Sequence, residues 1–357
     1  MNIAIIIGTR PEIIKMAPII RELERRNRTF FVLHTGQHYS YNLDRVFIEQ
    51  LNLPKSKHNL HVRSDSSAVQ TGKMLTRVGE VLQQEKPDIV LVEGDTNSVL
   101  AGALAAVKLH IKVGHVEAGL RSYDRSMPEE INRILVDHCS DLLFAPTENA
   151  MAILHGEGIP GDRIFMTGNT IVDSVYQNLE MGRDKTDALN MLGLQPKKYF
   201  LATIHRQENV DNKVRFASIL EGLEHVAEKF KTPVIYPIHP RSLSRMRMFD
   251  LEPRKIKLID PVDYFSFLQL ESSASLVLTD SGGVQEEACI LGVPCVTLRD
   301  NTERPETIEI GSNVLAGTLP EKVLKYTELM LGKELGWKNP FGDGKAGERI
   351  VDIITGR

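Results

Sequence analysis

Three acidic residues in the first half of the chain occur where a reaction could use them. Asp95 and Glu117 follow the apolar segments Ile89–Val92 and Lys112–Val116, and Glu129 opens a helical pattern soon afterwards. Carboxyl groups that crowd together raise one another's pKa, which suits proton transfer near neutral pH. We therefore expect the three to take part in proton transfer. A helix cap at Asp95 and a favourable helix-dipole contact at Glu129 are the structural alternatives.

A glycine pair in the second half predicts an anion-binding turn. Ser281-Gly282-Gly283 comes just after the apolar segment Leu276–Thr279 and just before a helical pattern. Glycines let backbone N–H groups approach an anion closely, and a helix N-terminus favours negative charge. The pattern predicts a cradle for a diphosphate. Glu287, one turn further on, is expected to accept hydrogen bonds from a ribose diol, whereas Glu286 is expected to face solvent.

Basic residues follow two other apolar segments of the second half. His205 and Arg206 come directly after Tyr199–Ile204, and His239 follows the next segment in the same way. A His-Arg pair at such a position favours a site for a phosphate or a leaving group over an ordinary polar loop. Arg304 is a further cation expected near this site.

The first apolar segment runs into a turn that also suits a phosphate. Gly8 permits a tight turn, Pro11 fits the first position of a helix, and Arg10 and Lys15 supply positive charge. The alternative is a plain strand-to-helix turn with solvated charges. The turn has neither the dinucleotide-binding glycine pattern nor the Walker pattern, which argues against NAD and ATP as ligands.

The order of the segments predicts two parallel sheets in succession. Short β-branched runs alternate with amphipathic helical patterns, as in doubly wound α/β domains. The predicted strands of the first sheet are Ile3–Ile7, Phe30–His34, Ile89–Val92, Lys112–Val116, Leu142–Ala145 and Ile164–Met166. Those of the second are Tyr199–Ile204, Pro233–Ile238, Lys255–Ile259, Leu276–Thr279 and Pro294–Leu298. Ligands of such sheets bind at the carboxyl ends of the strands, where all of these polar residues are expected.

Length and composition limit the classes of function. A chain of 357 residues is long enough for two domains, and a net charge of −4 argues against nucleic-acid or anionic-membrane binding. The three cysteines, Cys139, Cys289 and Cys295, have neither disulfide-framework nor zinc spacing, and no other metal motif occurs, so we expect no metal. No signal peptide and no membrane-length apolar run are evident, which predicts a cytoplasmic protein.

Seven motifs in order resemble the non-hydrolysing UDP-N-acetylglucosamine 2-epimerases. They are Gly8–Glu12 with Lys15, Gly94–Thr96, Gly114–Arg121, Pro128–Arg133, His205–Asn209, Thr279–Glu287 and Thr302–Glu306. The resemblance implies the GT-B fold, in which two Rossmann-like domains enclose an interdomain cleft, and a homodimer. It implies domains at residues 1–170 and 171–343, with a last helix at about 344–357 that packs back on the first domain.

The resemblance also implies roles for individual residues. Asp95, Glu117, Glu129 and His205 match catalytic positions. Positions that bind the UDP-sugar are matched by Asp95, Glu117 and His205 together with Arg10, Lys15, Phe267 (near the uracil), Ser281, Gly282, Gly283, Glu287 and Arg304. A second UDP-N-acetylglucosamine, which activates some members, would contact Gln37, Glu129, Arg206 and His239. At this activator site the chain departs from some members at Ser40 and Val262.

The expected activity is reversible conversion of UDP-N-acetylglucosamine (UDP-GlcNAc) to UDP-N-acetylmannosamine (UDP-ManNAc). UDP would leave to give 2-acetamidoglucal and then add back, without a cofactor, and the product would serve cell-surface polysaccharide synthesis. The alternatives are a GT-B glycosyltransferase, a hydrolysing relative, an epimerase for a UDP-diacetamido sugar and a non-catalytic sugar-nucleotide sensor. The carboxylates argue against the transferase and the sensor, which do not need all three.

Overall fold

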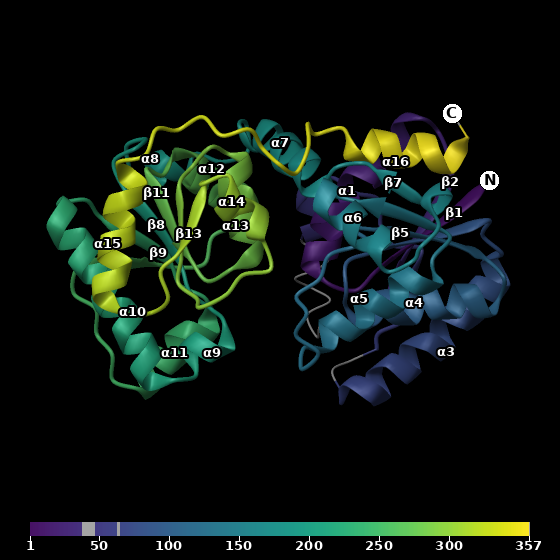
Figure 1. Ribbon diagram of the computed structural model, residues 1–357, viewed down its shortest axis with the longest axis horizontal. Helices are drawn as coiled ribbons and strands as arrows, with labels where there is room; N and C mark the ends of the chain where they lie inside the picture. The colour runs from purple at the N-terminus through teal and green to yellow at the C-terminus, as the bar shows by residue number, and fades with distance from the viewer. Residues whose placement is uncertain (38–46, 63–64, 357) are drawn as a thin grey trace. The chain divides into compact units, whose positions relative to one another are not determined.

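The computed structural model describes residues 1–37, 47–62 and 65–356, which form two compact units (Figure 1). The first unit contains Met1–Ser174 and Phe341–Arg357, and the second contains Val175–Pro340. Ser40 lies outside the described residues. No helix in the described part of the chain is long and apolar enough to cross a membrane.

The first unit is built on a seven-stranded parallel sheet in the order β3-β2-β1-β4-β5-β6-β7. The strands are β1 (Asn2–Ile7), β2 (Thr29–His34), β3 (His58–Asn59), β4 (Ile89–Glu93), β5 (Lys112–Val116), β6 (Leu142–Ala145) and β7 (Ile164–Met166). The order reverses between β1 and β4, and the turns after these two strands carry the Gly8 and Asp95 motifs. A switch point of this kind is where parallel α/β sheets bind ligands.

Helices cover both faces of this sheet, which is why its strands are continuous apolar runs. One face packs against α3 (Ser67–Glu85), α4 (Asn97–Lys108) and α5 (Pro128–Cys139). Helices α1 (Arg10–Arg25), α6 (Glu148–Gly156) and α16 (Ala346–Thr355) lie on the other side (Figure 1). The 3-10 turn η1 (Gly161–Arg163) precedes β7.

The second unit repeats this design with six parallel strands in the order β10-β9-β8-β11-β12-β13. The strands are β8 (Phe200–Thr203), β9 (Val234–Pro237), β10 (Ile256–Ile259), β11 (Leu276–Thr279), β12 (Cys295–Thr297) and β13 (Asn313–Leu315). Its helices are α8 (Ala188–Leu192), α9 (Gln207–Val210), α10 (Lys213–Phe230), α11 (Pro240–Met248), α12 (Tyr264–Ser273), α13 (Gly282–Ile290), α14 (Pro305–Glu309) and α15 (Pro320–Leu331). The order again reverses between the first strand of the unit, β8, and β11. The predicted fold class of two doubly wound parallel sheets is confirmed.

Two edge strands were not predicted from the sequence. β3 contains only two residues and β13 three, and each pairs with a single neighbour. Both begin with polar residues, His58 and Asn313, so neither forms a continuous apolar run. Such strands depend on the neighbour that they pair with rather than on their own hydrophobic pattern.

The C-terminal helix belongs to the first unit and packs against α1. A proline inside a helix lacks the N–H that the carbonyl four residues earlier would accept. For Pro18 of α1 that carbonyl is Ile14 O, which accepts the hydroxyl of Ser174 at 2.9 Å. A Cβ added at Gly347 of α16 would lie 3.1 Å from Pro18, so glycine lets the two helices approach closely here.

Helix α16 begins on a buried carboxylate. Asp173, in α7 (Thr170–Gly182), accepts the N–H groups of Ala346 at 3.1 Å and Gly347 at 2.9 Å. These are orphan donors of the first helical turn, and a negative charge there also complements the helix dipole. Burial raises the pKa of Asp173, although the two N–H groups oppose that rise.

Glu12 connects the two turns at the switch point of the first sheet through hydrogen bonds. Its carboxylate accepts the Gly8 N–H at 2.6 Å and the hydroxyls of Thr9 and Thr96, each at 2.8 Å. Burial raises the pKa of Glu12 from an ordinary 4.5 to about 7, against the effect of these hydrogen bonds. Gly8 is needed here because a Cβ would lie 2.0 Å from the Ser98 hydroxyl.

Gly119 fixes the loop that follows Glu117. Its φ is +87°, and an added Cβ would lie 2.4 Å from the backbone oxygen of Ala150 in α6. Both the backbone conformation and the lack of space require glycine.

We expect Gly119→Ala to destabilise the first unit much more than Gly158→Ala. Gly158 has φ +83° but open space around its Cβ position, so its substitution adds only the backbone cost of about 1–2 kcal/mol. At Gly119 the contact with Ala150 adds about 1–3 kcal/mol. Each kcal/mol lowers the Tm of a unit of this size by about 2–4 °C, measurable by scanning calorimetry. Equal losses of Tm in the two variants would contradict this account.

We expect Glu12→Gln to stabilise the protein increasingly, relative to wild type, as the pH rises. Because the folded pKa of Glu12 is raised, its protonated form contributes stability that is complete below 4.5 and is lost as the pH rises through about 7. Glutamine resembles the protonated acid and does not titrate, so the difference grows by up to about 1.4 kcal/mol per pH unit across that window.

The measurement is Tm against pH for wild type, Glu12→Gln and the control Glu24→Gln, which changes an exposed residue of the same helix. A Glu12→Gln difference that stays constant with pH would show that Glu12 does not titrate in this range.

Candidate functional site

A buried ion pair lies at the carboxyl ends of β4 and β5. The Lys15 ammonium, from α1, contacts the carboxylate of Glu117 and lies 3.4 Å from Oε1 of Glu93. The side chains are 12% exposed for Lys15, 4% for Glu117 and 2% for Glu93. An ion pair with so little exposure interacts far more strongly than one at the surface. The structure therefore brings two predicted site residues, Lys15 and Glu117, together. It also places beside them Glu93, which was not predicted to lie at the site.

The backbone of Glu117 is held in an unusual conformation. Its φ is +67°, in the left-handed region that residues other than glycine, asparagine and aspartate seldom adopt. Glu117 directly follows β5 and begins the turn that Gly119 completes. Such a conformation costs about 1–3 kcal/mol and persists only where the surroundings enforce it, most often at functional sites.

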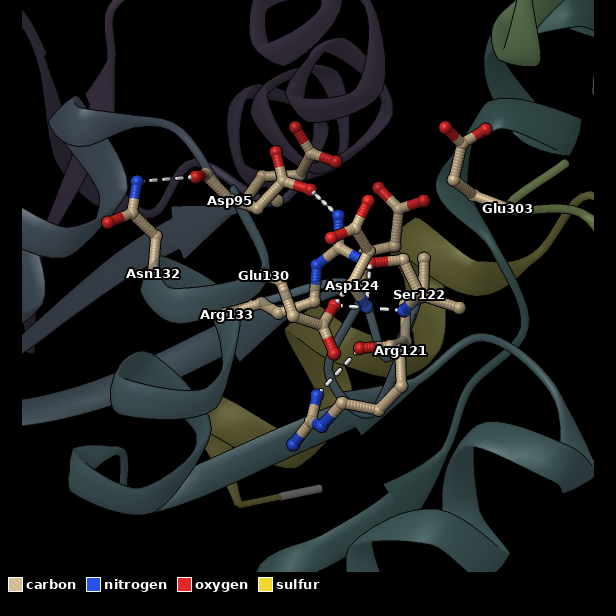
Figure 2. A network of polar contacts seen from close by, with 12 residues as sticks. Asp95, Arg121, Ser122, Asp124, Glu130, Asn132, Arg133 and Glu303 are labelled. Carbon is tan, nitrogen blue, oxygen red and sulfur yellow. Dashed lines mark hydrogen bonds and ion pairs between the residues drawn. The ribbon is translucent and has the colours of Figure 1, made fainter. Parts of the chain in front are cut away.

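Asp95 lies at the neighbouring strand end and is held by helix α5. Its carboxylate pairs with the Arg133 guanidinium, and its backbone oxygen accepts the Asn132 amide at 2.9 Å, as Figure 2 shows. The side chain of Asp95 remains 31% exposed. Gly94 donates its N–H to the Val116 carbonyl at 3.2 Å, which fixes the end of β4 beside the residue that precedes Glu117.

The two adjacent acids that open α5 have different surroundings. Glu129 is exposed, whereas Glu130 is buried and accepts N–H groups from Ser122 at 2.8 Å and Tyr123 at 3.0 Å. Glu130 also pairs with Arg133 at 3.1 Å (Figure 2). Burial would raise the pKa of Glu130, but these hydrogen bonds lower it. Glu130 therefore holds the loop at Ser122 and Tyr123 in place, and Glu129 remains accessible to solvent.

A network centred on the buried side chains of His115 and Asp137 supports this end of the sheet from behind. His115 in β5 contacts Asp137 Oδ1 through Nδ1 at 2.6 Å and the Gly94 carbonyl through Nε2 at 2.8 Å. The second oxygen of Asp137 accepts the Arg121 guanidinium at 2.7 Å, and Arg121 in turn binds Glu157. The network thus fixes the turn that carries Asp95.

In the second unit a single buried carboxylate organises the loop after β8. Asp280, which follows β11, accepts the N–H groups of His205 at 3.1 Å and Arg206 at 3.0 Å, and the Asn209 amide at 3.1 Å. Its Oδ1 lies 3.5 Å from His205 Nδ1. Desolvation lowers the pKa of His205, and Asp280 opposes this. The ring of His239 lies 6.2 Å from that of His205.

The predicted anion cradle is the start of helix α13. Ser281 is the residue before the first turn, and its side chain makes no capping hydrogen bond to that turn. A Cβ added at Gly283 would meet no atom within 4 Å. The Arg206 guanidinium and the Glu303 carboxylate both lie near Gly282, 3.8 Å and 3.7 Å from the position that a Cβ would take. Backbone N–H groups with a cation beside them are suited to an anionic group.

One expectation about this helix was wrong. Glu286 does not face solvent: it is 1% exposed and pairs with Arg304, with Oε1 2.7 Å from Nε. Glu286 can point into the protein because Arg304, the residue before α14, pairs with its carboxylate. Glu287 is also buried and accepts the Tyr264 hydroxyl at 2.8 Å.

The other predicted site residues are placed as follows. Arg10 is exposed at the first residue of α1. Phe267 is partly buried in α12 and packs against the core of the second unit. Gln37, in the first unit, accepts the Ser98 N–H at 3.0 Å and the Ser98 hydroxyl at 2.7 Å. His239 caps α11 by accepting the Arg241 N–H at 3.2 Å.

Several residues that build the site were not singled out from the sequence. Glu93, Asp137 and Asp280 are all buried, at 2%, 0% and 0% exposure, and each contacts a predicted site residue or the loop that carries one. Glu93 and Asp280 each stand at or directly after the end of a predicted strand, which is the signal that singled out Asp95 and Glu117. Asp137 lies within a helix, and no sequence pattern marks it.

Comparison with known proteins identifies the family. A family model described as UDP-N-acetylglucosamine 2-epimerase matches residues 21–355. The UDP-N-acetylglucosamine 2-epimerase of Methanocaldococcus jannaschii is 56% identical over 362 residues, which cover 99% of each chain. The UDP-2,3-diacetamido-2,3-dideoxy-D-glucuronate 2-epimerase of Pseudomonas aeruginosa is 41% identical, again with 99% of each chain covered.

A solved structure shares the fold over the full length. The crystal structure of the M. jannaschii UDP-GlcNAc 2-epimerase in complex with UDP-GlcNAc and UDP matches with a TM-score of 0.91 and covers 100% of both chains. The predicted GT-B-like fold, with two parallel-sheet α/β domains, and the predicted resemblance are both confirmed. With these similarities along its whole length, the chain belongs to the UDP-N-acetylglucosamine 2-epimerase family, whose members are isomerases.

Proposed function

We propose that the protein interconverts UDP-GlcNAc and UDP-ManNAc by inverting C2 of the sugar. Family membership supports the substrate, because the relative at 56% identity carries this name and its crystal structure contains UDP-GlcNAc and UDP. The observation that carries the chemistry is the placement of Asp95 and Glu117 on adjacent strand ends, with Lys15 held against Glu117.

The reaction that fits these residues is elimination followed by re-addition. A carboxylate takes the C2 proton, the electron pair of the C2–H bond forms the C1–C2 double bond, and the C1–O bond breaks with its electrons leaving on UDP. A proton then adds to the opposite face of C2 in the resulting 2-acetamidoglucal, and a UDP oxygen re-forms the bond to C1. One proton is removed from C2 and one is added, and no electrons are gained or lost, so the overall reaction is an isomerisation.

We assign proton transfer to Asp95, Glu117 and Glu129 of the first unit. Asp95 and Glu129 retain exposure to solvent, and Glu117 is held by Lys15 in a strained conformation. Two faces of C2 need one proton donor and one acceptor, and the third carboxylate is free to orient the sugar.

We assign UDP recognition chiefly to the second unit. The open first turn of α13, with Ser281, Gly282 and Gly283, would bind the diphosphate, and Glu287 would accept hydrogen bonds from the ribose. His205, Arg304, Arg10 and Lys15 would stabilise the negative charge that develops on UDP as the C1–O bond breaks. Phe267 would lie near the uracil.

The family resemblance also implies an activator site and a homodimer, and we propose both on that ground. A second UDP-GlcNAc would contact Gln37, Glu129, Arg206 and His239, and the chain would form a homodimer in the cytoplasm. Gln37 is already engaged by Ser98, so an activator would have to use its amide N–H₂ group or displace that contact.

A second candidate substrate is a UDP-linked diacetamido sugar acid, supported by the 41% identity to the Pseudomonas aeruginosa epimerase that acts on UDP-2,3-diacetamido-2,3-dideoxy-D-glucuronate. The elimination chemistry at C1 and C2 would be the same. Comparison of kcat/KM for the two sugar nucleotides separates these candidates. The family match disfavours the glycosyltransferase alternative.

We expect the purified protein to exchange deuterium from D2O into C2 of UDP-GlcNAc and to form UDP-ManNAc with no added cofactor. Asp95→Asn should lower both rates by about 10²–10⁴-fold, the usual contribution of general acid–base catalysis, while UDP affinity measured by calorimetry changes little. Asp162→Asn, at an exposed site of the same unit, is the control and should behave as wild type. Product without deuterium at C2 would rule out proton abstraction.

A further inference from the structure

Glu93 is a buried acid next to the ion pair of Lys15 and Glu117, with no role in the mechanism above. It is the last residue of β4, and register pairs it with Val116, the residue before Glu117. Lys15 contacts Glu117 directly but lies 3.4 Å from Glu93. The ammonium thus has one close carboxylate partner and one more distant carboxyl neighbour.

The charges around Glu93 do not balance if every acid is ionised. Lys15 is a cation beside Glu93, and Glu117 and Glu12 are two further acids near enough to affect its charge. A single ammonium cannot compensate two buried carboxylates, and an uncompensated buried charge is very costly. Burial raises the pKa of Glu93 well above its usual range; Lys15 opposes this rise, and Glu117 and Glu12 add to it.

We propose that Glu93 is a positioning residue that carries a proton in the working enzyme and so leaves the Lys15 ammonium paired with Glu117 alone. A neutral Glu93 holds one side of the ammonium without competing for its charge. An ionised Glu93 would draw Lys15 away and place a second negative charge beside Glu117. This inference rests on the proposed function, in which Glu117 acts at C2 and Lys15 supports the leaving UDP.

The first test measures the protonation state directly and needs no activity. Glu93→Gln replaces the acid by a neutral group of the same size, and infrared difference spectra are recorded between wild type and this variant at pH 7. We expect wild type to show the carbonyl stretch of a protonated carboxyl that the variant lacks. A difference spectrum that contains only carboxylate bands would overturn the proposal.

The second test is kinetic and compares three variants. Because glutamine keeps the neutral state, Glu93→Gln should retain kcat within about threefold of wild type. A threefold change in rate corresponds to less than half the change in activation free energy that a tenfold change requires. Glu93→Leu removes the polar group and should lose about 100-fold or more, as expected for a displaced acid–base group. Glu80→Gln, at an exposed site of α3, is the control and should equal wild type.

The two tests separate the failure of each idea. A folded Glu93→Gln that loses about as much activity as Glu93→Leu would show that Glu93 works as a carboxylate, contrary to the proposal. Wild-type protein that epimerises neither sugar nucleotide would refute the proposed function, and the infrared result would still decide the charge of Glu93.

Discussion

The interaction on which the first unit depends is the buried contact between the Lys15 ammonium and the carboxylate of Glu117. Charges removed from water need compensation nearby, so the elements that carry them must hold a fixed geometry. The parallel sheet supplies that geometry, because the reversal of strand order between β1 and β4 brings α1 and the ends of β4 and β5 to one place.

Further acids surround this contact, and each is stabilised in a different way. Glu12 receives three hydrogen bonds from the two turns at the switch point, and Asp95 is paired with an arginine of α5. Asp137 lies behind the strand ends between an imidazole and a guanidinium. Different surroundings give carboxyl groups different proton affinities, which an enzyme needs if one acid is to donate a proton while another accepts one.

The second unit uses the same sheet topology to hold a buried carboxylate at its own switch point. At its switch point the buried charge is Asp280, and it is compensated mainly by the backbone N–H groups of His205 and Arg206 and by the Asn209 amide. That arrangement orients a histidine and an arginine, while the first turn of α13 offers N–H groups. One unit thus concentrates the carboxylates to which we assign proton transfer, and the other presents groups that favour an anion.

Much of this arrangement could be predicted because strand ends in parallel sheets are informative positions. Four strands, β5, β6, β7 and β11, have the predicted bounds, and Asp95 and Glu117 were expected at strand ends, where the structure places them. Burial of an individual side chain could not be predicted, because it depends on partners far along the chain. Glu286 is buried by Arg304, and Glu93 by Lys15, 78 residues away. The short edge strands β3 and β13 depend on their neighbours in the same way.

The central claim is that epimerisation proceeds through cleavage of the bond between C1 and the diphosphate oxygen. It is tested most directly by positional isotope exchange, with oxygen-18 placed in the oxygen that bridges C1 and the β-phosphorus of UDP-GlcNAc. The account predicts that recovered UDP-GlcNAc and UDP-ManNAc carry the label in the non-bridging oxygens of the β-phosphate as well as in the bridge. UDP-ManNAc that forms with all of its label still in the bridging position would contradict it.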